Sequence, residues 1–466
     1  MRKKTTRINK IFNCWQIFII FTTIIFSLYN NNNPLNYNFE LNKKYLEIQL
    51  ALNLTFNNKL KEKIKLAIYY TSIKNGGIER LTSLLLNYLD KAKIFDTYLL
   101  TQQPKEENEY SIPMNSKRII VNSKIKKNNL FNILIKEKIN ILIYHFYNSI
   151  EIQNLNNLKK INIIIYNNSC IFYWIYTNSL SIYKTTYHAY QKSKYVISLV
   201  PFENDYLFKK WGINSILMGN FITYEYNSVI PSDLSSPTIL MIGRGNDKLK
   251  RFELGIESMP LIIKQIPECE MKIISDLNDI DNLKKIIKFL KLQNNIKLVG
   301  YTPTPEIYFK NASLHIFPSI SESFGLVLSE TKIFGIPNIL VGLDYLSITK
   351  GGTIMIYDDN SETISKEAIK ILKNDKYRKK LGKEARKSMQ KFKNIDLLQK
   401  WVGLILSIYN GYNYYEIFRL KDKRMPKKEA INILSNQIEL LKNRILRFQN
   451  ISINNIINFK FMENLQ

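Results

Sequence analysis

Short apolar runs alternate with longer amphipathic segments over most of the chain. In the first half, apolar runs predict six strands, at residues 64–70, 97–101, 118–121, 141–145, 161–166 and 195–200. Helical periodicity fills most of the intervals between them, as at Leu81, Leu84, Leu85 and Leu89. This alternation of strands and helices is typical of a parallel sheet. Residues 63–230 are therefore predicted to form a first Rossmann-like domain.

The second half repeats the pattern more clearly. Strands are predicted at residues 238–243, 271–275, 296–299, 314–317, 338–341 and 353–357, and helices at 254–266, 281–292 and 361–372. The intervening stretch, residues 220–237, is irregular and rich in Ser, Pro and Asn, so we place the domain hinge there. Residues 236–392 are predicted to form a second Rossmann-like domain, followed by a helix at 393–410. At 466 residues the chain is long enough for two such cores.

The C-terminal extension, residues 411–466, carries a further helical pattern. Apolar residues recur there at spacings of three and four, at Ile431, Leu434, Ile438, Leu441, Ile445 and Phe448. Such a short repeat is marginal for a coiled coil. The pattern is open to two interpretations, weak self-association through residues 431–448 or packing against the chain's own body.

The N-terminus has the pattern of a membrane anchor. Residues 1–10 carry five basic residues and no acid, and residues 11–29 contain no charge. At about 1.5 Å per residue this segment just crosses a hydrocarbon core about 30 Å thick. We predict a basic cytosolic tail, a transmembrane signal anchor at 11–29 and a polar stem at 30–62.

The basic tail is expected in the cytosol, which predicts a single-pass membrane protein of the ER or Golgi type with a lumenal C-terminal domain. A cleaved signal peptide is less favoured, because residues 26–29 lack a small-x-small cleavage pattern. The orientation stays open, since the following region is itself very basic. Three cysteines imply no disulfide framework.

Charge favours an anionic partner. Lys and Arg number 67 against 39 acids, a net charge of +28, which suits a membrane surface, a nucleotide or a phosphate-bearing acceptor. Most of these lysines are interpreted as solvated helix faces. No nucleic-acid-binding motif accompanies them, so a nucleic-acid partner is not expected.

Two carboxylates stand around one predicted strand-to-helix loop. The strand at 314–317 is followed by Glu322, a helix opens at Gly325, and Glu330 lies eight residues beyond Glu322. Open α/β sheets bind ligands at the carboxyl ends of their strands, and the amides of residues 323–326 at a helix N-terminus suit a phosphate. Because carboxylates accept hydrogen bonds from paired hydroxyls, the arrangement points to a nucleotide sugar.

Glu322 and Glu330, with Phe324 and Gly325 between them, resemble the E-x7-E signature of retaining GT-B glycosyltransferases, especially glycosyltransferase family 4. Further segments resemble that family in the same order: the glycine loop with Gly76 and Gly77, the phosphate-binding strand end with Arg244 and Lys250, and the base-contacting turn with Gly300 and Tyr301. The resemblance covers residues 63–410. It implies an α/β GT-B fold, two Rossmann-like domains facing across a cleft, with the helix at 393–410 crossing back onto the first domain.

The resemblance also implies roles for these residues. Arg244 and Lys250 would hold the diphosphate, although Lys248 and Arg251 are near enough to be confused with Lys250. Glu322 would hold hydroxyls of the donor sugar and Glu330 those of the ribose. The donor-binding set further includes Ser323, Phe324, Gly325 and Leu326. No cofactor is implied, since the nucleoside-diphosphate sugar is itself a substrate.

One segment departs from the family pattern, and another resembles a motif of a different fold. Many members carry a histidine where this chain has Asn167, Asn168 and Ser169. His145, after the preceding strand, is then the most plausible imidazole and our second catalytic candidate beside Glu322, although a structural role is the commoner one for such a histidine. The Asp279–Asp281 pair mimics a metal-binding motif of another fold, and we expect no metal site there.

The sequence thus predicts a membrane-anchored, metal-independent, retaining glycosyltransferase that moves a sugar from a UDP- or GDP-sugar to a glycan, glycolipid or glycoprotein acceptor. A phosphorylase or sugar-nucleotide hydrolase on the same fold is an alternative. A catalytically silent sugar-nucleotide-binding or assembly subunit is another, suggested by the absent histidine and the C-terminal extension.

Overall fold

The computed structural model describes residues 62–447, apart from residues 75, 108, 123–128, 147, 159–160, 167–179, 245–248, 277–279, 303 and 412–425. The predicted anchor at 11–29 lies outside these residues, as do all but the last residue of the predicted stem. Within the described ranges, no helix is both long and apolar enough to cross a membrane. Residues 59–466 belong to one compact unit.

The first half of this unit contains a seven-stranded parallel sheet in the order β3-β2-β1-β4-β5-β6-β7. Its strands are β1 (Ile64–Tyr70), β2 (Phe95–Thr101), β3 (Lys117–Ile120), β4 (Ile141–Tyr144), β5 (Asn162–Tyr166), β6 (Tyr195–Ser198) and β7 (Ile216–Leu217). Every strand predicted in this half is present, with ends shifted by one or two residues. Only β7 was not predicted, because two residues are too few for a periodicity to be visible.

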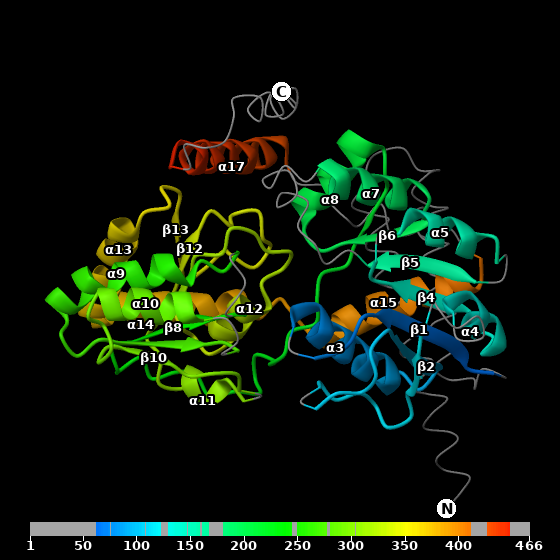
Figure 1. Ribbon diagram of the computed structural model, residues 1–466, viewed down its shortest axis with the longest axis horizontal. Helices are drawn as coiled ribbons and strands as arrows, with labels where there is room; N and C mark the ends of the chain where they lie inside the picture. The colour runs from blue at the N-terminus through cyan, green and yellow to red at the C-terminus, as the bar shows by residue number, and fades with distance from the viewer. Residues whose placement is uncertain are drawn as a thin grey trace, which may run out of the picture. The chain divides into compact units, whose positions relative to one another are not determined.

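Helices connect these strands and lie on both faces of the sheet (Figure 1). They are α3 (Gly77–Lys91), α4 (Leu130–Lys136), α5 (Ser149–Asn156), α7 (Leu180–Gln191) and α8 (Pro201–Trp211). Side-chain caps fix two of the starts: Asn129 accepts from the amide of Asn132, and Asn148 from that of Glu151. The start of α3 follows directly on the glycine loop after β1, at the sheet's carboxyl edge.

The second half contains a six-stranded parallel sheet in the order β10-β9-β8-β11-β12-β13. Its strands are β8 (Thr238–Ile242), β9 (Glu270–Ile274), β10 (Ile296–Leu298), β11 (Leu314–Phe317), β12 (Asn338–Val341) and β13 (Thr353–Ile356). The predicted strands all appear here. Two parallel sheets with this connectivity confirm the α/β GT-B-like class.

The helices of this half are α9 (Phe252–Gln265), α10 (Asp281–Phe289), α11 (Glu306–Phe309), α12 (Leu326–Ile333), α13 (Ser361–Lys373) and α14 (Asp375–Ser388). The sequence did not specify α14. Its segment is highly charged, and it buries only Arg378, Leu381, Gly382 and Ala385, so its apolar stripe is too narrow to stand out.

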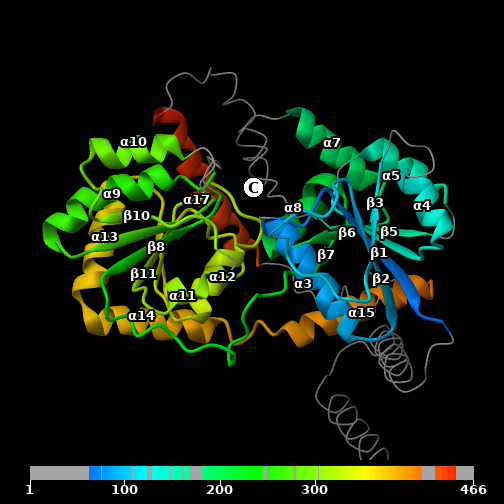
Figure 2. The same ribbon diagram turned by 60° about the horizontal axis from the view of Figure 1, so that its bottom comes forward.

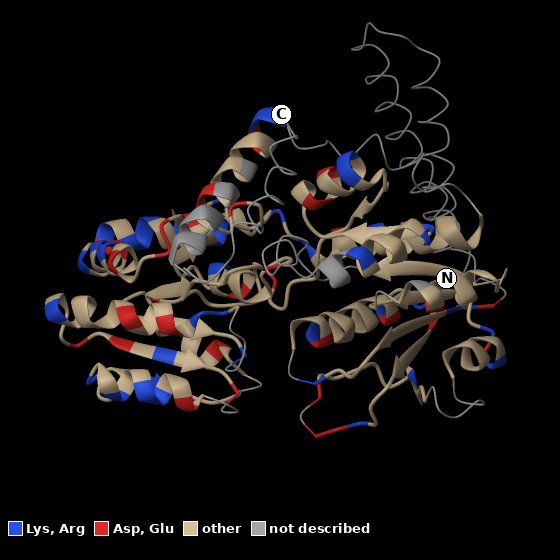
Figure 3. Cartoon of the chain, turned by 45° about the horizontal axis from the view of Figure 1, so that its top comes forward, with Lys and Arg blue, Asp and Glu red and all other residues tan. Residues whose placement is uncertain are grey.

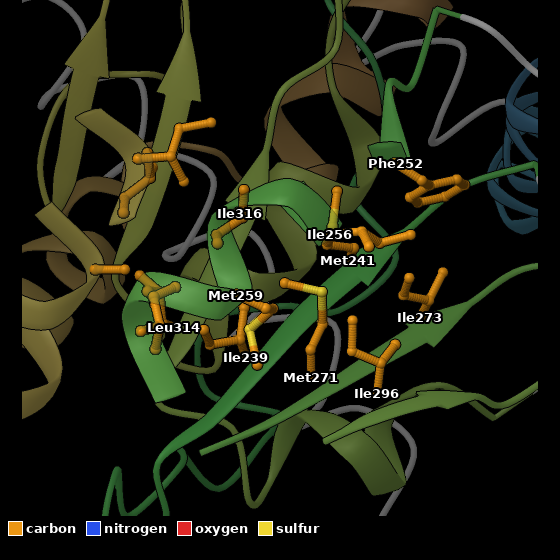
Figure 4. Close-up of a cluster of buried hydrophobic side chains, with 14 of the residues drawn as sticks. Ile239, Met241, Phe252, Ile256, Met259, Met271, Ile273, Ile296, Leu314 and Ile316 are labelled. Carbon is orange, nitrogen blue, oxygen red and sulfur yellow. The ribbon is translucent and has the colours of Figure 1, made fainter. Parts of the chain in front are cut away.

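A core of buried side chains fixes the strands that lead into the candidate site. Ile239 and Met241 on β8 and Ile316 on β11 meet Ile256 and Met259 on α9, all at most 1 % exposed (Figure 4). Full burial of such a side chain contributes about 1.5–3 kcal/mol. This packing holds β8 and β11 in place, and with them the segments that follow their carboxyl ends.

The chain crosses between the two halves a second time after α14. Helix α15 (Asn394–Tyr409) packs against α3, beside the first sheet (Figures 1 and 2). Asn394, 1 % exposed, starts this helix and bonds both backbone groups of Ile222 in the other crossing segment, at 2.9 Å each. The crossover expected from the family resemblance is thus present.

The last described helix is α17 (Lys427–Arg447). Ile433, Gln437 and Leu440 are buried, and Leu440 belongs to the core of the second half. The described side chains of α17 therefore pack against the chain's own body, which is one of the two interpretations left open by the sequence. Self-association through 431–448 has no support here.

Candidate functional site

A cavity of about 450 Å³ is lined by residues from both halves of the unit. The first half contributes the glycine loop and start of α3, together with Tyr110 and Asn220. The second half contributes the segments that follow β8, β9, β10 and β11. All of these are carboxyl ends of parallel strands or loops next to them, which is where open α/β sheets bind ligands.

Most of the predicted site residues line this one cavity. They are Gly76, Gly77, Arg244, Lys250, Tyr301, Glu322, Ser323, Phe324, Gly325, Leu326 and Glu330. Gly300 does not line it but adopts a left-handed φ of 89°, which turns the chain into Tyr301. Residues more than 240 positions apart, such as Gly76 and Glu322, thus share one space, as the resemblance implied.

Glu322 lies in the loop between β11 and α12, 14 % exposed, and pairs with Lys250. The Lys250 Nζ lies 2.5 Å from Glu322 Oε1 and 5.6 Å from the centre of the Phe317 ring. The loop turns into α12 at Gly325, whose φ of 84° favours glycine. The catalytic candidate and the phosphate-binding candidate therefore neutralise each other.

Lys250 and Arg251, neighbours in the segment between β8 and α9, face in different directions. Lys250 lines the cavity, whereas Arg251 is turned into the second half, where it donates to the Pro318 carbonyl at 2.7 Å and pairs with Asp359. Of these two neighbours, the structure thus assigns Lys250 and not Arg251 to the cavity. Lys248, the other residue that the sequence could confuse with Lys250, lies outside the described residues. Arg251 also joins the segment after β8 to the end of β11, which holds Lys250 beside Glu322.

Glu330 is buried on α12, with 1 % of its side chain exposed, and is not a solvated helix position. Its Oε1 accepts from Arg80 Nη1 and from Thr223 Oγ1, at 2.7 Å each. Burial lowers the pKa of Arg80, but the Glu330 carboxylate together with Tyr110 and Tyr224 more than offsets this, so the pKa is raised. No role was predicted for Arg80 or Thr223, because sequence spacing does not reveal a contact between the two halves.

The glycine loop allows a close approach. A Cβ on Gly76 would lie 1.8 Å from Glu79 Oε2, so the Glu79 carboxylate rests directly on this backbone at the start of α3. Burial raises the pKa of Glu79, against the opposing effects of the Ile78 and Glu79 amides and of Arg244. The start of α3 thus has a carboxylate of the chain itself against it.

Two tyrosines border the cavity from opposite halves. Tyr301, which follows β10, is 38 % exposed, and Tyr110 reaches the cavity from the segment between β2 and β3. Burial raises the pKa of Tyr110 to about 12, against the effect of Arg80. Tyr110 was not predicted, because an aromatic residue in an irregular segment carries no pattern.

His145, the second catalytic candidate, is not among the residues that line the cavity. It is 5 % exposed, with its ring centre 5.5 Å from that of Tyr70 and 5.3 Å from that of Tyr166. Burial lowers its pKa to about 3, so the ring is neutral near pH 7. The structure therefore places His145 in a packing position and does not bring it to the cavity.

No group of three or more His, Cys, Asp or Glu residues suited to a metal occurs in the part of the chain that the structure describes. Asp279 lies outside that part, and Asp281 is exposed and paired with Lys284 at 3.0 Å. The expected absence of a metal site stays a prediction.

Lys and Arg are spread over helices and loops of both halves (Figure 3).

Comparison with known proteins agrees with the geometry of the second half. Residues 225–388 match the family model of glycosyl transferases group 1. A stretch of 186 residues, 39 % of this chain, is 28 % identical to the poly(glycerol-phosphate) alpha-glucosyltransferase of Bacillus subtilis and covers 26 % of that protein. Another of 164 residues, 34 % of the chain, is 26 % identical to the poly(ribitol-phosphate) alpha-N-acetylglucosaminyltransferase of Staphylococcus aureus and covers 33 % of it. The chain thus spans about a quarter to a third of these two relatives.

Solved structures show the same fold over a larger share of the chain. Sucrose-phosphate synthase from Thermosynechococcus elongatus matches with a TM-score of 0.63 and 15 % identity over 75 % of this chain and all of the other. HepE from Anabaena, solved in complex with UDP and glucose, matches with a TM-score of 0.60 and 13 % identity, over 74 % of this chain and 100 % of the other. The resemblance to GT-B glycosyltransferases is confirmed at the level of the fold.

The buried Arg80–Glu330 pair predicts a large loss of stability when it is broken. Arg80→Met leaves a carboxylate buried without its cation, which should lower the free energy of unfolding by about 3–5 kcal/mol. The measurement is denaturant-induced unfolding without nucleotide. Lys93→Met is the matched control, since the Lys93 side chain is 73 % exposed and its pair with Asp90 should contribute about 1 kcal/mol or less.

The double variant Arg80→Met/Glu330→Gln tests the cause of that loss. Removing the unpaired charge should restore part of the lost stability, so the two substitutions should be less costly together than their sum. Strictly additive losses, or equal losses for Arg80→Met and Lys93→Met, would show that the pair does not carry this role.

Proposed function

We propose that this chain, whose residues 225–388 match glycosyl transferases group 1, is a retaining glycosyltransferase of the GT-B fold. It moves a sugar from a UDP- or GDP-sugar to a glycan, glycolipid or glycoprotein acceptor without a metal, and residues 11–29 anchor it to a membrane. The observation that carries the proposal is the convergence of Arg244, Lys250, Glu322 and Glu330 on one cavity with the glycine loop of the first half.

Each of these groups has a task in binding the donor. Arg244 and Lys250 face the diphosphate and stabilise the negative charge that grows on it as the sugar leaves. Glu330 accepts hydrogen bonds from the ribose hydroxyls and Glu322 from hydroxyls of the sugar. Lys250 is paired with Glu322, so a bound diphosphate competes with Glu322 for Lys250 and leaves the Glu322 carboxylate to the sugar hydroxyls.

The transfer breaks the bond between the sugar's anomeric carbon and the diphosphate oxygen, and the electron pair stays on that oxygen. The acceptor hydroxyl oxygen forms the new bond on the same face of the sugar and loses its proton. No histidine is among the described residues that line the cavity. We therefore assign the departing diphosphate oxygen as the base that takes this proton.

The acceptor we favour carries phosphate. The relatives above are named for transfer onto poly(glycerol-phosphate) and poly(ribitol-phosphate), and this chain has a net charge of +28. A polyanionic acceptor would be attracted to such a surface. Acceptor polymers with and without phosphate, compared at two salt concentrations, distinguish this class from a neutral glycan.

A catalytically silent sugar-nucleotide-binding subunit is the second candidate. It is favoured by two observations: no histidine is among the described residues that line the cavity, and Glu322 is neutralised by Lys250. Donor binding without turnover in the presence of acceptors would support it. A hydrolase or phosphorylase would instead form product without a glycan acceptor.

The substitution Glu322→Gln tests the proposed function directly. It removes the charge that neutralises Lys250, so affinity for the nucleoside diphosphate should be retained or raised. Transfer should fall on the order of 100-fold or more, as for other losses of a group that acts in the transition state. Calorimetry gives the affinity and a product assay the rate, with the exposed Glu384→Gln as control. A parallel fall of both quantities with the fold intact, or no change in either, would refute the role of Glu322.

The proposed anchor has a separate test. Full-length protein should stay in membranes during alkaline carbonate extraction, and a chain beginning near Leu60 should remain soluble and bind donor, because the first strand starts at Ile64. Release of the full-length protein would reject the anchor. Protease protection of residues 427–447 in sealed vesicles would support the proposed lumenal side, and ready cleavage the cytosolic one.

A further inference from the structure

The hydroxyl of Tyr345 holds the backbone of Glu322. It donates to the Glu322 carbonyl and accepts from the Glu322 amide, at 2.9 Å in each case. Tyr345 is 2 % exposed and does not line the cavity. A buried side chain 23 positions away in sequence therefore fixes both backbone polar groups of the residue to which we assign the donor sugar.

Tyr345 lies between β12 and β13. We call residues 342–350 of that segment the 342–350 loop. Leu346 and Ile348 of this loop pack beneath Gly325, where a Cβ would lie 3.6 Å and 3.4 Å from their Cδ1 atoms. The buried Lys332 on α12 donates to the carbonyls of Ile348 and Lys350, at 2.5 Å and 2.8 Å. The loop is thus fastened from inside to the helix that carries Glu330.

Helix α17 fastens the same loop from outside. Gln437 donates to the Gly342 carbonyl at 2.5 Å and to Asp344 Oδ1 at 2.9 Å, and Asn436 donates to Asp344 Oδ2 at 2.8 Å. A Cβ on Gly342 would lie 2.1 Å from a methyl group of Leu440, so the helix rests directly on the loop. Figure 1 shows α17 beside β12 and β13, the strands that flank the loop.

These contacts form one continuous path. The side chains of Asn436 and Gln437 hold Asp344, the neighbouring Tyr345 holds Glu322, and Glu322 meets Lys250 in the cavity. The segment from β11 to α12 lies outside the strand ladder, so its position depends on contacts of this kind. An amide and a carbonyl that lose their partner in such a place cost free energy and shift the chain.

We propose that Tyr345 is a positioning residue for Glu322 and that α17, which lies beyond the region matched to the family model, acts through Asp344 and Tyr345 to place it. This inference rests on the proposed function. It assigns α17 a part in sugar transfer in addition to covering the second sheet. A misplacement of about 1 Å at a reacting centre costs on the order of 100-fold in rate, so a distant contact is able to matter.

The first test is Tyr345→Phe in the full chain. The ring is kept and only the hydroxyl is lost, so folding should persist. We expect kcat to fall about 10-fold or more, with KM for the donor and affinity for the nucleoside diphosphate changed less than about 3-fold. Tyr144→Phe is the matched control, because Tyr144 is also buried and its hydroxyl donates to Glu151 in the first half, outside the path through Asp344, Tyr345 and Glu322. Equal effects of the two variants, or an unchanged kcat for Tyr345→Phe, would overturn the proposal.

The second test is the double variant Asn436→Ala/Gln437→Ala, with the exposed Ser435→Ala on the same helix as control. The double variant should lower kcat in the wild-type background and have little further effect in Tyr345→Phe, because both act on the same residue. Full additivity would overturn the path through Tyr345. If the wild-type protein transfers no sugar from any donor, the proposed function itself is wrong. If the wild-type protein is active but insensitive to these substitutions, only the role of Tyr345 and α17 is wrong.

Discussion

The candidate site depends on the pairing of cations and carboxylates around one cavity. Lys250 and Glu322 neutralise each other within the second half, and Arg80 and Glu330 do so between the two halves. Isolated charges in such partly or fully buried positions would be costly, so each charge of the site is stabilised by its partner. In the proposed function the same pairs hold the charges where a donor needs them, because a diphosphate would compete for the cation and hydroxyl groups would compete for the carboxylate. On the proposed function, donor binding is an exchange of partners at these side chains.

The rest of the fold holds these charged side chains in position. The core between α9 and the strands β8 and β11 fixes the origins of the segments that carry Lys250 and Glu322, and Arg251 joins the two segments at Pro318. The Arg80–Glu330 pair and the Asn394 contacts connect the two halves at separate points. Helix α17 and the 342–350 loop add a support on the outer side. The site is thus assembled from segments distant in sequence, each fixed by local packing.

Much of this arrangement could be predicted from the sequence, and the remainder has identifiable physical causes. Buried parallel strands are continuous apolar runs, so twelve of the thirteen described strands were found, and the motif glycines and carboxylates pointed to one cavity. Three kinds of feature carried no local signal: the two-residue β7, the highly charged α14, and contacts such as Arg80–Glu330 or Tyr345–Glu322 that depend on tertiary structure. His145 was predicted near the site because it follows a strand. In the structure it packs against the rings of Tyr70 and Tyr166 and does not line the cavity.

The most direct test of the exchange of partners is a crystal structure with a bound nucleoside diphosphate, UDP or GDP, chosen by which one raises the melting temperature of the protein. The account predicts the diphosphate within hydrogen-bonding distance of Arg244 and Lys250, the ribose hydroxyls at Glu330, and Lys250 Nζ withdrawn from its 2.5 Å contact with Glu322. A nucleotide bound in this cavity with the Lys250–Glu322 pair intact, or one bound away from these four side chains, would contradict it.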